Sequence, residues 1–140
     1  MSLPTRTDLN RLMAFFMLLA YAGLIFRLSS GAVPDTVMFI GAPDFLLHMA
    51  EYAVLGFLVS RWVSLETGRT GWLVLVALPA MIASAYGTTD EVHQAFVSFR
   101  ESSFSDIWAD TVGGAMGAFA YAVLLWRFGR RAEPSAQRAR

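Results

Sequence analysis

The sequence predicts an all-α integral membrane protein, a bundle of four transmembrane helices with both termini in the cytoplasm. Three observations lead to this prediction. Hydrophobic residues make up 56% of the 140 residues and charged residues only 16%, which is too apolar for a soluble domain of this size. Four stretches are long and apolar enough to cross about 30 Å of hydrocarbon as helices. The arginines lie mainly on one side of these stretches, which marks the cytoplasmic side.

Each predicted span has a recognisable feature. The first runs to Arg27 without a clear cleavage site, so we interpret it as a retained segment rather than a signal peptide. Asp44, which follows Pro43, is expected to cap the second span. Pro79 predicts a kink in the third, and Ser103–Asp106 ("SFSD") resembles a capping box that opens the fourth. The spans are about residues 11–29, 45–65, 71–92 and 106–127.

The basic residues fix the predicted orientation. All of them are arginines, and only Arg27 and Arg100 lie on the side of the first and third loops, which should therefore face outward. The other nine lie before the first span, between the second and third, or after the fourth: Arg6, Arg11, Arg61, Arg69, Arg127, Arg130, Arg131, Arg138 and Arg140.

The chain is expected to contain one transmembrane domain over residues 1–130, followed by a disordered cytoplasmic tail over residues 131–140. The absence of cysteine excludes disulfides, a thiol nucleophile and a thiolate metal site. The net charge of zero argues against a nucleic-acid partner. An oligomer remains open.

Three spans carry polar residues at helical spacing near the predicted outer face. Such groups do not face lipid, so the three polar stripes are expected to face one another. Gly113 and Gly117 form a G-x-x-x-G ridge that would let a neighbouring backbone approach and bring Asp110 toward the other stripes. The stripes comprise Asp44, His48, Glu51 and Tyr52; Tyr86, Asp90, His93 and Gln94; and Asp106 and Asp110, with the carboxylate of Glu91 at the same level.

Carboxylates in these stripes outnumber the available cations, which implies protonated carboxyls, a bound cation, or a cationic or hydrogen-bonding ligand. Asp90 and Asp110 are expected to act as one unit facing His48. Simpler interpretations stay open, with His48 as a core histidine, Asp44 and Asp106 as caps, and Arg100 as an interfacial anchor. The catalytic candidates are His48, Glu51, Asp90, Glu91 and Asp110, and the substrate-binding candidates are Asp44, Tyr52, Tyr86, Gln94, Arg100 and Asp106.

No metal ligand set is predicted, because the chain has no cysteine and no H-E-x-x-H spacing. Partial protonation of the acidic cluster is the favoured interpretation, and no cofactor is identified. The sequence also lacks a nucleophilic serine motif and a Walker loop, so the reaction class, and whether the chain is an enzyme at all, stay open.

Over about residues 44–118 the chain resembles the VanZ-like family of small bacterial membrane proteins. The family pattern is approximately D-K-x-x-H-x-x-x-Y, then D-E-x-x-Q-x-F, a nearby Arg, and D-x-x-x-N followed by glycines. Phe45 stands where Lys is common and Asp110 where Asn is common, so this site is more acidic than the pattern. The matching residues are Asp44, His48, Tyr52, Asp90, Glu91, Gln94, Phe96, Arg100, Asp106, Asp110, Gly113 and Gly114.

The resemblance implies a multi-pass protein of the bacterial plasma (inner) membrane with a role in the cell envelope, in a family sometimes tied to glycopeptide (teicoplanin) resistance. It does not supply a biochemical activity. Our leading hypothesis is a protein that binds or modifies a membrane lipid headgroup or a lipid-linked envelope precursor at the extracytoplasmic side. The alternatives are a proton- or cation-coupled carrier and a non-catalytic membrane adaptor.

Overall fold

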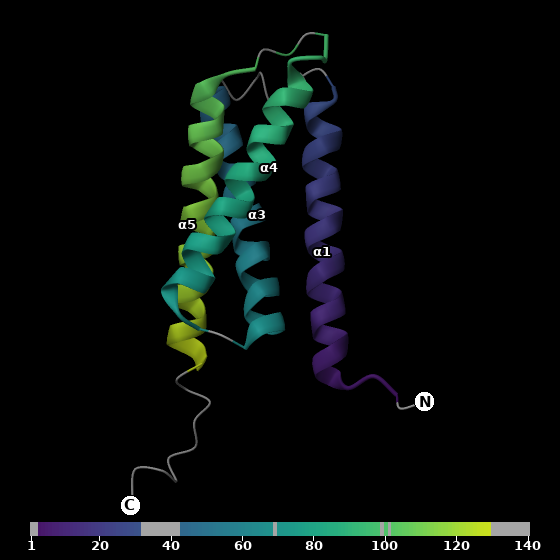
Figure 1. Ribbon diagram of the computed structural model, residues 1–140, viewed down its shortest axis with the longest axis vertical. Coiled ribbons are helices and arrows are strands. Elements are labelled where there is room, and N and C mark those ends of the chain that lie inside the picture. Colours follow the sequence, from purple (N-terminus) through teal and green to yellow (C-terminus); the bar gives the residue numbers. More distant parts are fainter. Residues whose placement is uncertain (1–2, 32–42, 69, 99, 101, 130–140) are drawn as a thin grey trace, which may run out of the picture.

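A computed structural model describes residues 3–31, 43–68, 70–98, 100 and 102–129. These residues form four long helices, which confirms the all-α prediction for the described part of the chain. The helices lie side by side, with the start of α1 and the end of α5 at the same end of the bundle (Figure 1). They are α1 (Arg6–Ser29), α3 (Asp44–Thr67), α4 (Leu78–Gln94) and α5 (Phe104–Gly129), with a π-helical turn, η1 (Leu73–Ala77), directly before α4.

Three helical segments of the described chain are long and apolar enough to cross a membrane, namely Arg6–Ser29, Leu73–Gln94 and Phe104–Phe128. Helix α3 is not among them, because His48, Glu51 and Arg61 interrupt its apolar stretch. Its 24 residues extend about 36 Å, which is enough to span the hydrocarbon. The crossing of α3 therefore stays a prediction that rests on its length and its place among the other helices.

The helix starts differ in part from the sequence prediction. Helix α1 begins several residues earlier than expected, because Thr5 and Asp8 form a reciprocal capping box. The Asp8 amide donates to Thr5 Oγ1 at 3.2 Å, and the Asp8 carboxylate accepts from the Thr5 amide at 3.0 Å. The predicted Asp44 cap was wrong. Pro43 occupies the capping position of α3, and Asp44 is already the first helical residue, where no side-chain cap bond forms.

Pro79 marks an irregular segment, although the irregularity lies just before it. Residues Leu73–Ala77 form the π turn η1, and Pro79 lies at the start of α4. Because proline has no N–H, it cannot donate to the carbonyl of Leu75, four residues earlier. The Ser60 hydroxyl of α3 donates to that carbonyl at 2.6 Å. A polar side chain from the neighbouring helix thus bonds the backbone group that Pro79 leaves without its usual α-helical donor.

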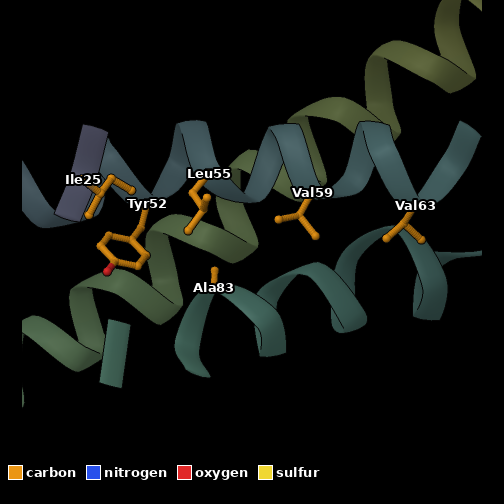
Figure 2. Packing of buried hydrophobic residues seen from close by; sticks show 6 residues of the cluster. All are labelled: Ile25, Tyr52, Leu55, Val59, Val63 and Ala83. Atoms are coloured by element: carbon orange, nitrogen blue, oxygen red, sulfur yellow. The ribbon is translucent and has the colours of Figure 1, made fainter. Parts of the chain in front are cut away.

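The apolar core lies between α1, α3 and α4. Figure 2 shows Leu55, Val59 and Val63 along one face of α3, directed toward α4, with Ala83 opposite them. Tyr52 and Ile25 close the cluster at the end where α3 begins. The core therefore fills the bundle from Tyr52 toward the opposite end of α3.

Helix α5 packs backbone to backbone against α3. A Cβ atom added at Gly113 would meet the carbonyl of Met49, and one added at Gly117 would meet the carbonyl of Ala53. The predicted close approach at the G-x-x-x-G ridge is thereby confirmed, and the partner is α3. This contact brings the first turns of α5 beside those of α3, which is what places Asp110 in reach of His48.

Candidate functional site

Helix α3 begins, α4 ends and α5 begins at the same end of the bundle (Figure 1). The polar residues predicted to form the site lie mainly at this end. At this end His48 Nδ1 lies 3.0 Å from Asp110 Oδ1 and 3.9 Å from Glu91 Oε1. Each of the three helices contributes one of these side chains. They are 6% (His48), 0% (Asp110) and 3% (Glu91) exposed, so the contacts form inside the bundle rather than on its surface. We call these three residues the inner trio.

The Asp110 carboxylate occupies a space that exists because residue 87 is glycine. A Cβ atom on Gly87 of α4 would overlap Asp110 Oδ2 and come within contact of its Cβ and Cγ. The carboxylate is therefore fixed between Gly87 on one side and His48 on the other. Nothing in the sequence pattern distinguished Gly87 from the other glycines of the chain.

Two carboxylate oxygens and a hydroxyl in this region are buried without a hydrogen-bond partner among the described residues. They are Tyr52 OH, Glu91 Oε1 and Asp110 Oδ2. A buried polar atom left unpaired costs about 1–3 kcal/mol, more when it is charged, and is uncommon in a folded protein. Three in one region indicate a place where a ligand, water or ion completes the bonding.

A second acidic group connects the inner trio with the surface. Potential ligand atoms of Asp44, His48 and Asp106 lie within 4.8 Å of one another, and Asp44 is exposed. We call these residues the outer trio. His48 belongs to both trios, so a chain of polar groups leads from the exposed Asp44 to the fully buried Asp110.

Glu91 also fixes the start of α5, which corrects the predicted capping box. The amide of Ser103 donates to Glu91 Oε2 at 2.8 Å, and not to the Asp106 carboxylate as a capping box requires. Ser103 Oγ accepts from the amide of Ser105 at 3.1 Å. Glu91 can do this because the end of α4 lies beside the start of α5. One oxygen of Glu91 is thus held while the other faces His48.

Asp90 lies next to Glu91 in sequence but faces α1. Its Oδ2 accepts from Ser29 Oγ at 2.8 Å and from Gln94 Nε2 at 3.0 Å. The structure therefore brings Asp110 to His48, whereas Asp90 and Gln94 form a separate buried group with α1. Ser29 was missed in the sequence analysis, and the only available signal was the pair of small polar residues at the end of the first span.

Other candidate residues also contact α1. Tyr86 OH donates to the carbonyl of Ala22 at 2.7 Å, and Tyr21 OH donates to the backbone carbonyl of Glu51 at 3.1 Å. The Glu51 side chain is half-buried and is not part of either trio. His93 Nε2 lies 3.0 Å from Ser30 Oγ. These contacts position α1 against the bundle near the site.

Arg100 donates hydrogen bonds to backbone carbonyls at the C-terminal end of α1. Its Nε donates to the carbonyl of Gly31 at 3.0 Å and its Nη2 to the carbonyl of Leu28 at 2.9 Å. Helix C-termini carry free carbonyls and partial negative charge, so a guanidinium there is favourable. Two of its donor groups are thus engaged by backbone, which leaves its remaining N–H groups for any ligand.

The inner trio has the chemistry of an oriented histidine. Asp110 engages Nδ1 of His48, so Nε2 is the ring nitrogen that remains for proton exchange or for a ligand. The ring of His48 stacks parallel to that of Tyr52, with centroids 6.4 Å apart. Tyr52 therefore limits the movement of the imidazole and presents its own unpaired hydroxyl in the same region.

Long apolar helices and a buried histidine–carboxylate cluster at one end of the bundle define a helical membrane protein with a polar site. The family model described as VanZ/LLP1 matches residues 11–126, a stretch that includes both trios and most of all four helices. The chain belongs to the VanZ/LLP1 family, which confirms the resemblance found in its motifs. Comparisons with curated proteins and with solved structures gave no match.

Proposed function

We propose that this protein crosses the bacterial plasma membrane four times and binds the headgroup of a membrane lipid or lipid-linked envelope precursor at its extracytoplasmic side. The observation that carries the proposal is the inner trio, a buried His48–Asp110 pair beside an unpaired oxygen of Glu91. The arginine asymmetry supports an outward-facing site, because α3 begins and α4 ends on the arginine-poor side.

The position of the site favours a ligand that is itself held in the membrane. His48 lies about 6 Å, one helical turn, below the exposed Asp44. A group at that depth is near the level where lipid headgroups meet the hydrocarbon. A lipid-linked ligand can present its polar head at this level without leaving the bilayer.

The charges favour particular chemical groups in that head. Asp110 holds Nδ1 of His48, so Nε2 would take or give a proton at a ligand hydroxyl or amine. Glu91 Oε1 and Tyr52 OH are free to bond the same group. An acidic site repels a phosphate, and the contacts of Arg100 with α1 leave it only part of its guanidinium for one.

A carrier is less consistent with the fold. A proton or cation that entered at the inner trio would next meet the apolar cluster of Leu55, Val59 and Val63 (Figure 2). That cluster lies toward the opposite end of α3, where the buried polar side chains of this helix are the hydroxyls of Ser60 and Ser64 and not the ionisable groups that a relay requires.

The adaptor remains the second candidate, because several polar residues hydrogen-bond between helices. Asp90 accepts from Ser29, Tyr86 donates to Ala22, and both contacts tie α1 to α4. In an adaptor, the inner trio would likewise only hold helices α3, α4 and α5 together. Substitution of His48 would then lower stability without any separate chemical consequence.

Lipid mass spectrometry tests the proposal. We would compare cells that lack the protein with cells that express wild type, His48→Gln or Glu66→Gln, the last being a control at the other end of α3. We expect wild type and Glu66→Gln to change a headgroup or precursor pool and His48→Gln to fail while still folded in the membrane. Identical pools with and without the wild-type protein would refute a modifying activity.

Retention on lipid would distinguish binding from modification. The purified protein would be equilibrated with envelope lipid extract, washed, and the bound lipids identified. We expect a specific lipid to be retained by wild type and lost from His48→Gln. If neither assay distinguishes these two proteins, the adaptor is the better interpretation. Teicoplanin susceptibility of the same strains tests whether this protein contributes to glycopeptide resistance.

A further inference from the structure

We infer that the inner trio, His48, Glu91 and Asp110, binds one divalent transition-metal ion of the Mn²⁺ or Zn²⁺ type. This inference goes beyond the proposed function but shares atoms with it. With the ion bound, Glu91 Oε1 is a metal ligand, and Nε2 of His48 and the hydroxyl of Tyr52 remain for a headgroup. It also departs from the protonated cluster that the sequence analysis favoured.

The distances within the inner trio suit a shared ion. Ligands about 2.0–2.2 Å from one ion lie about 3 Å apart when at right angles and about 3.5 Å apart in a tetrahedron. His48 Nδ1 and Asp110 Oδ1 are 3.0 Å apart, already within this range. Glu91 Oε1 is 3.9 Å from the same nitrogen, and one ligand atom from each of the three residues lies within 4.8 Å of the other two, so modest side-chain movements would bring all three onto one ion.

The unpaired oxygens are an independent sign of a missing partner. Glu91 Oε1 has no hydrogen-bond partner among the described residues although Glu91 is 3% exposed, and it faces the His48 nitrogen. Its second oxygen is held by the Ser103 amide, which fixes the carboxylate as outer-shell groups do around metals. Asp110 Oδ2 is likewise unpaired and is confined by Gly87.

Charge balance points the same way. With His48 protonated, the two carboxylates of the trio leave one net negative charge buried within the bundle. A divalent ion that replaces the proton on Nδ1 makes the set of three residues and ion neutral. A neutral set costs less to bury than an uncompensated charge.

The ligand types and the access path define the class of ion. One imidazole with two carboxylates suits Mn²⁺ or Zn²⁺, whereas Ca²⁺ and Mg²⁺ prefer oxygen ligands alone. The outer trio provides the route, because its Asp44 is exposed and its His48 also belongs to the inner trio. An ion arriving from outside can therefore be passed from Asp44 and Asp106 to Glu91 and Asp110.

The test uses the purified full-length protein in detergent, stripped with a strong chelator. Mn²⁺, Zn²⁺, Mg²⁺ and Ca²⁺ are then added back separately, with the thermal midpoint, metal content and the Mn²⁺ resonance spectrum as readouts. We expect the chelator to lower the midpoint, Mn²⁺ or Zn²⁺ to restore it at one ion per chain, and Mg²⁺ and Ca²⁺ to have little effect. A midpoint that responds to neither chelator nor any of the four ions, with no bound Mn²⁺, would overturn the inference and support protonation.

Variants locate the ion. Glu91→Gln should weaken binding at least about tenfold, and the exposed Glu66→Gln should bind like wild type. Asp44→Asn should also keep the ion, because it belongs only to the outer trio. Loss of binding in Asp44→Asn but not in Glu91→Gln would place the ion in the outer trio and refute the inner site. Should Glu91→Gln fail to fold, wild-type metal content and the Mn²⁺ spectrum still decide whether an ion binds.

Discussion

Gly87 of α4 lies directly against the carboxylate of Asp110 of α5, on the side opposite His48. The two helices can approach at this point only because residue 87 has no side chain. Gly87 thus leaves the space that the carboxylate occupies, and the hydrogen bond with His48 holds the carboxylate there.

Gly87→Ala should therefore displace Asp110 and weaken its bond to His48. We expect a loss of about 1–3 kcal/mol, as for overpacked cores, and a marked loss of activity. Gly23→Ala is a matched control, because Gly23 is also helical but has nothing within 4 Å of an added Cβ. Thermal midpoints in detergent compare the two. Equal midpoints for Gly87→Ala and Gly23→Ala would contradict the prediction, because they would show that α4 and α5 accommodate a methyl group beside Asp110.

Asp110→Asn separates charge from shape at the centre of the site. The amide has nearly the same volume and its oxygen can still accept from His48 Nδ1, so the protein should fold and insert. We expect activity to be lost because the negative charge is gone, measured as the lipid pool of cells expressing the variant. Asparagine is common at this position in the family pattern. Full activity would mean that Asp110 acts as a neutral hydrogen-bond partner, and it would weaken the inferred metal site.

The orientation of the bundle can be tested with single cysteines, since the chain has none of its own. Ser102 lies between α4 and α5, and Thr67 is the last residue of α3. Ser102→Cys should be labelled from outside by an impermeant thiol reagent, and Thr67→Cys only after the cytoplasmic side is opened. The reverse pattern would place the inner trio on the cytoplasmic side.

Ser60 should matter more than a buried hydroxyl usually does, because it bonds the Leu75 carbonyl that Pro79 cannot. We expect Ser60→Ala to cost about 1–2 kcal/mol of unfolding free energy. In a Pro79→Ala background the cost should fall, because the backbone amide at position 79 can then donate to the same carbonyl. A double-mutant cycle measures this coupling. Independent effects of the two substitutions would show that the carbonyl has another donor.

The helices were predictable because their signals are local. Apolar length located α1, η1 with α4, and α5. The polar stripe on α3 lies only partly inside the bundle, because His48 and Tyr52 are buried whereas Asp44 is exposed and Glu51 half-buried. Helix ends were less predictable. Whether Ser103 pairs with Asp106 or with Glu91 depends on how closely α4 approaches α5, and no pattern within SFSD encodes that distance.

The level of the site was predictable, but its pairing was not. The sequence analysis placed Glu51, Asp90, Glu91 and Asp110 near His48, and the structure joins only Glu91 and Asp110 to it. Asp90 shares their level, yet the helical rotation from residue 90 to residue 91 turns it toward α1. Ser29 could not be found from the sequence, because its role depends on a contact with a residue 61 positions away.

The contact between Ser29 and Asp90 has a consequence for how the chain is assembled during synthesis. Ser29 Oγ also lies 3.0 Å from the carbonyl of Ile25 in its own helix, so its single proton can go to either acceptor, and Asp90 also accepts from Gln94 within α4. Each partner thus has a bonding option inside its own helix before the two helices meet. Helix α1 can therefore enter the bilayer before α4, because the hydroxyl of Ser29 can bond the carbonyl of Ile25 until α4 arrives. Docking then exchanges one bond of Ser29 for another, so this hydroxyl does not oppose the approach of the two helices before it meets Asp90.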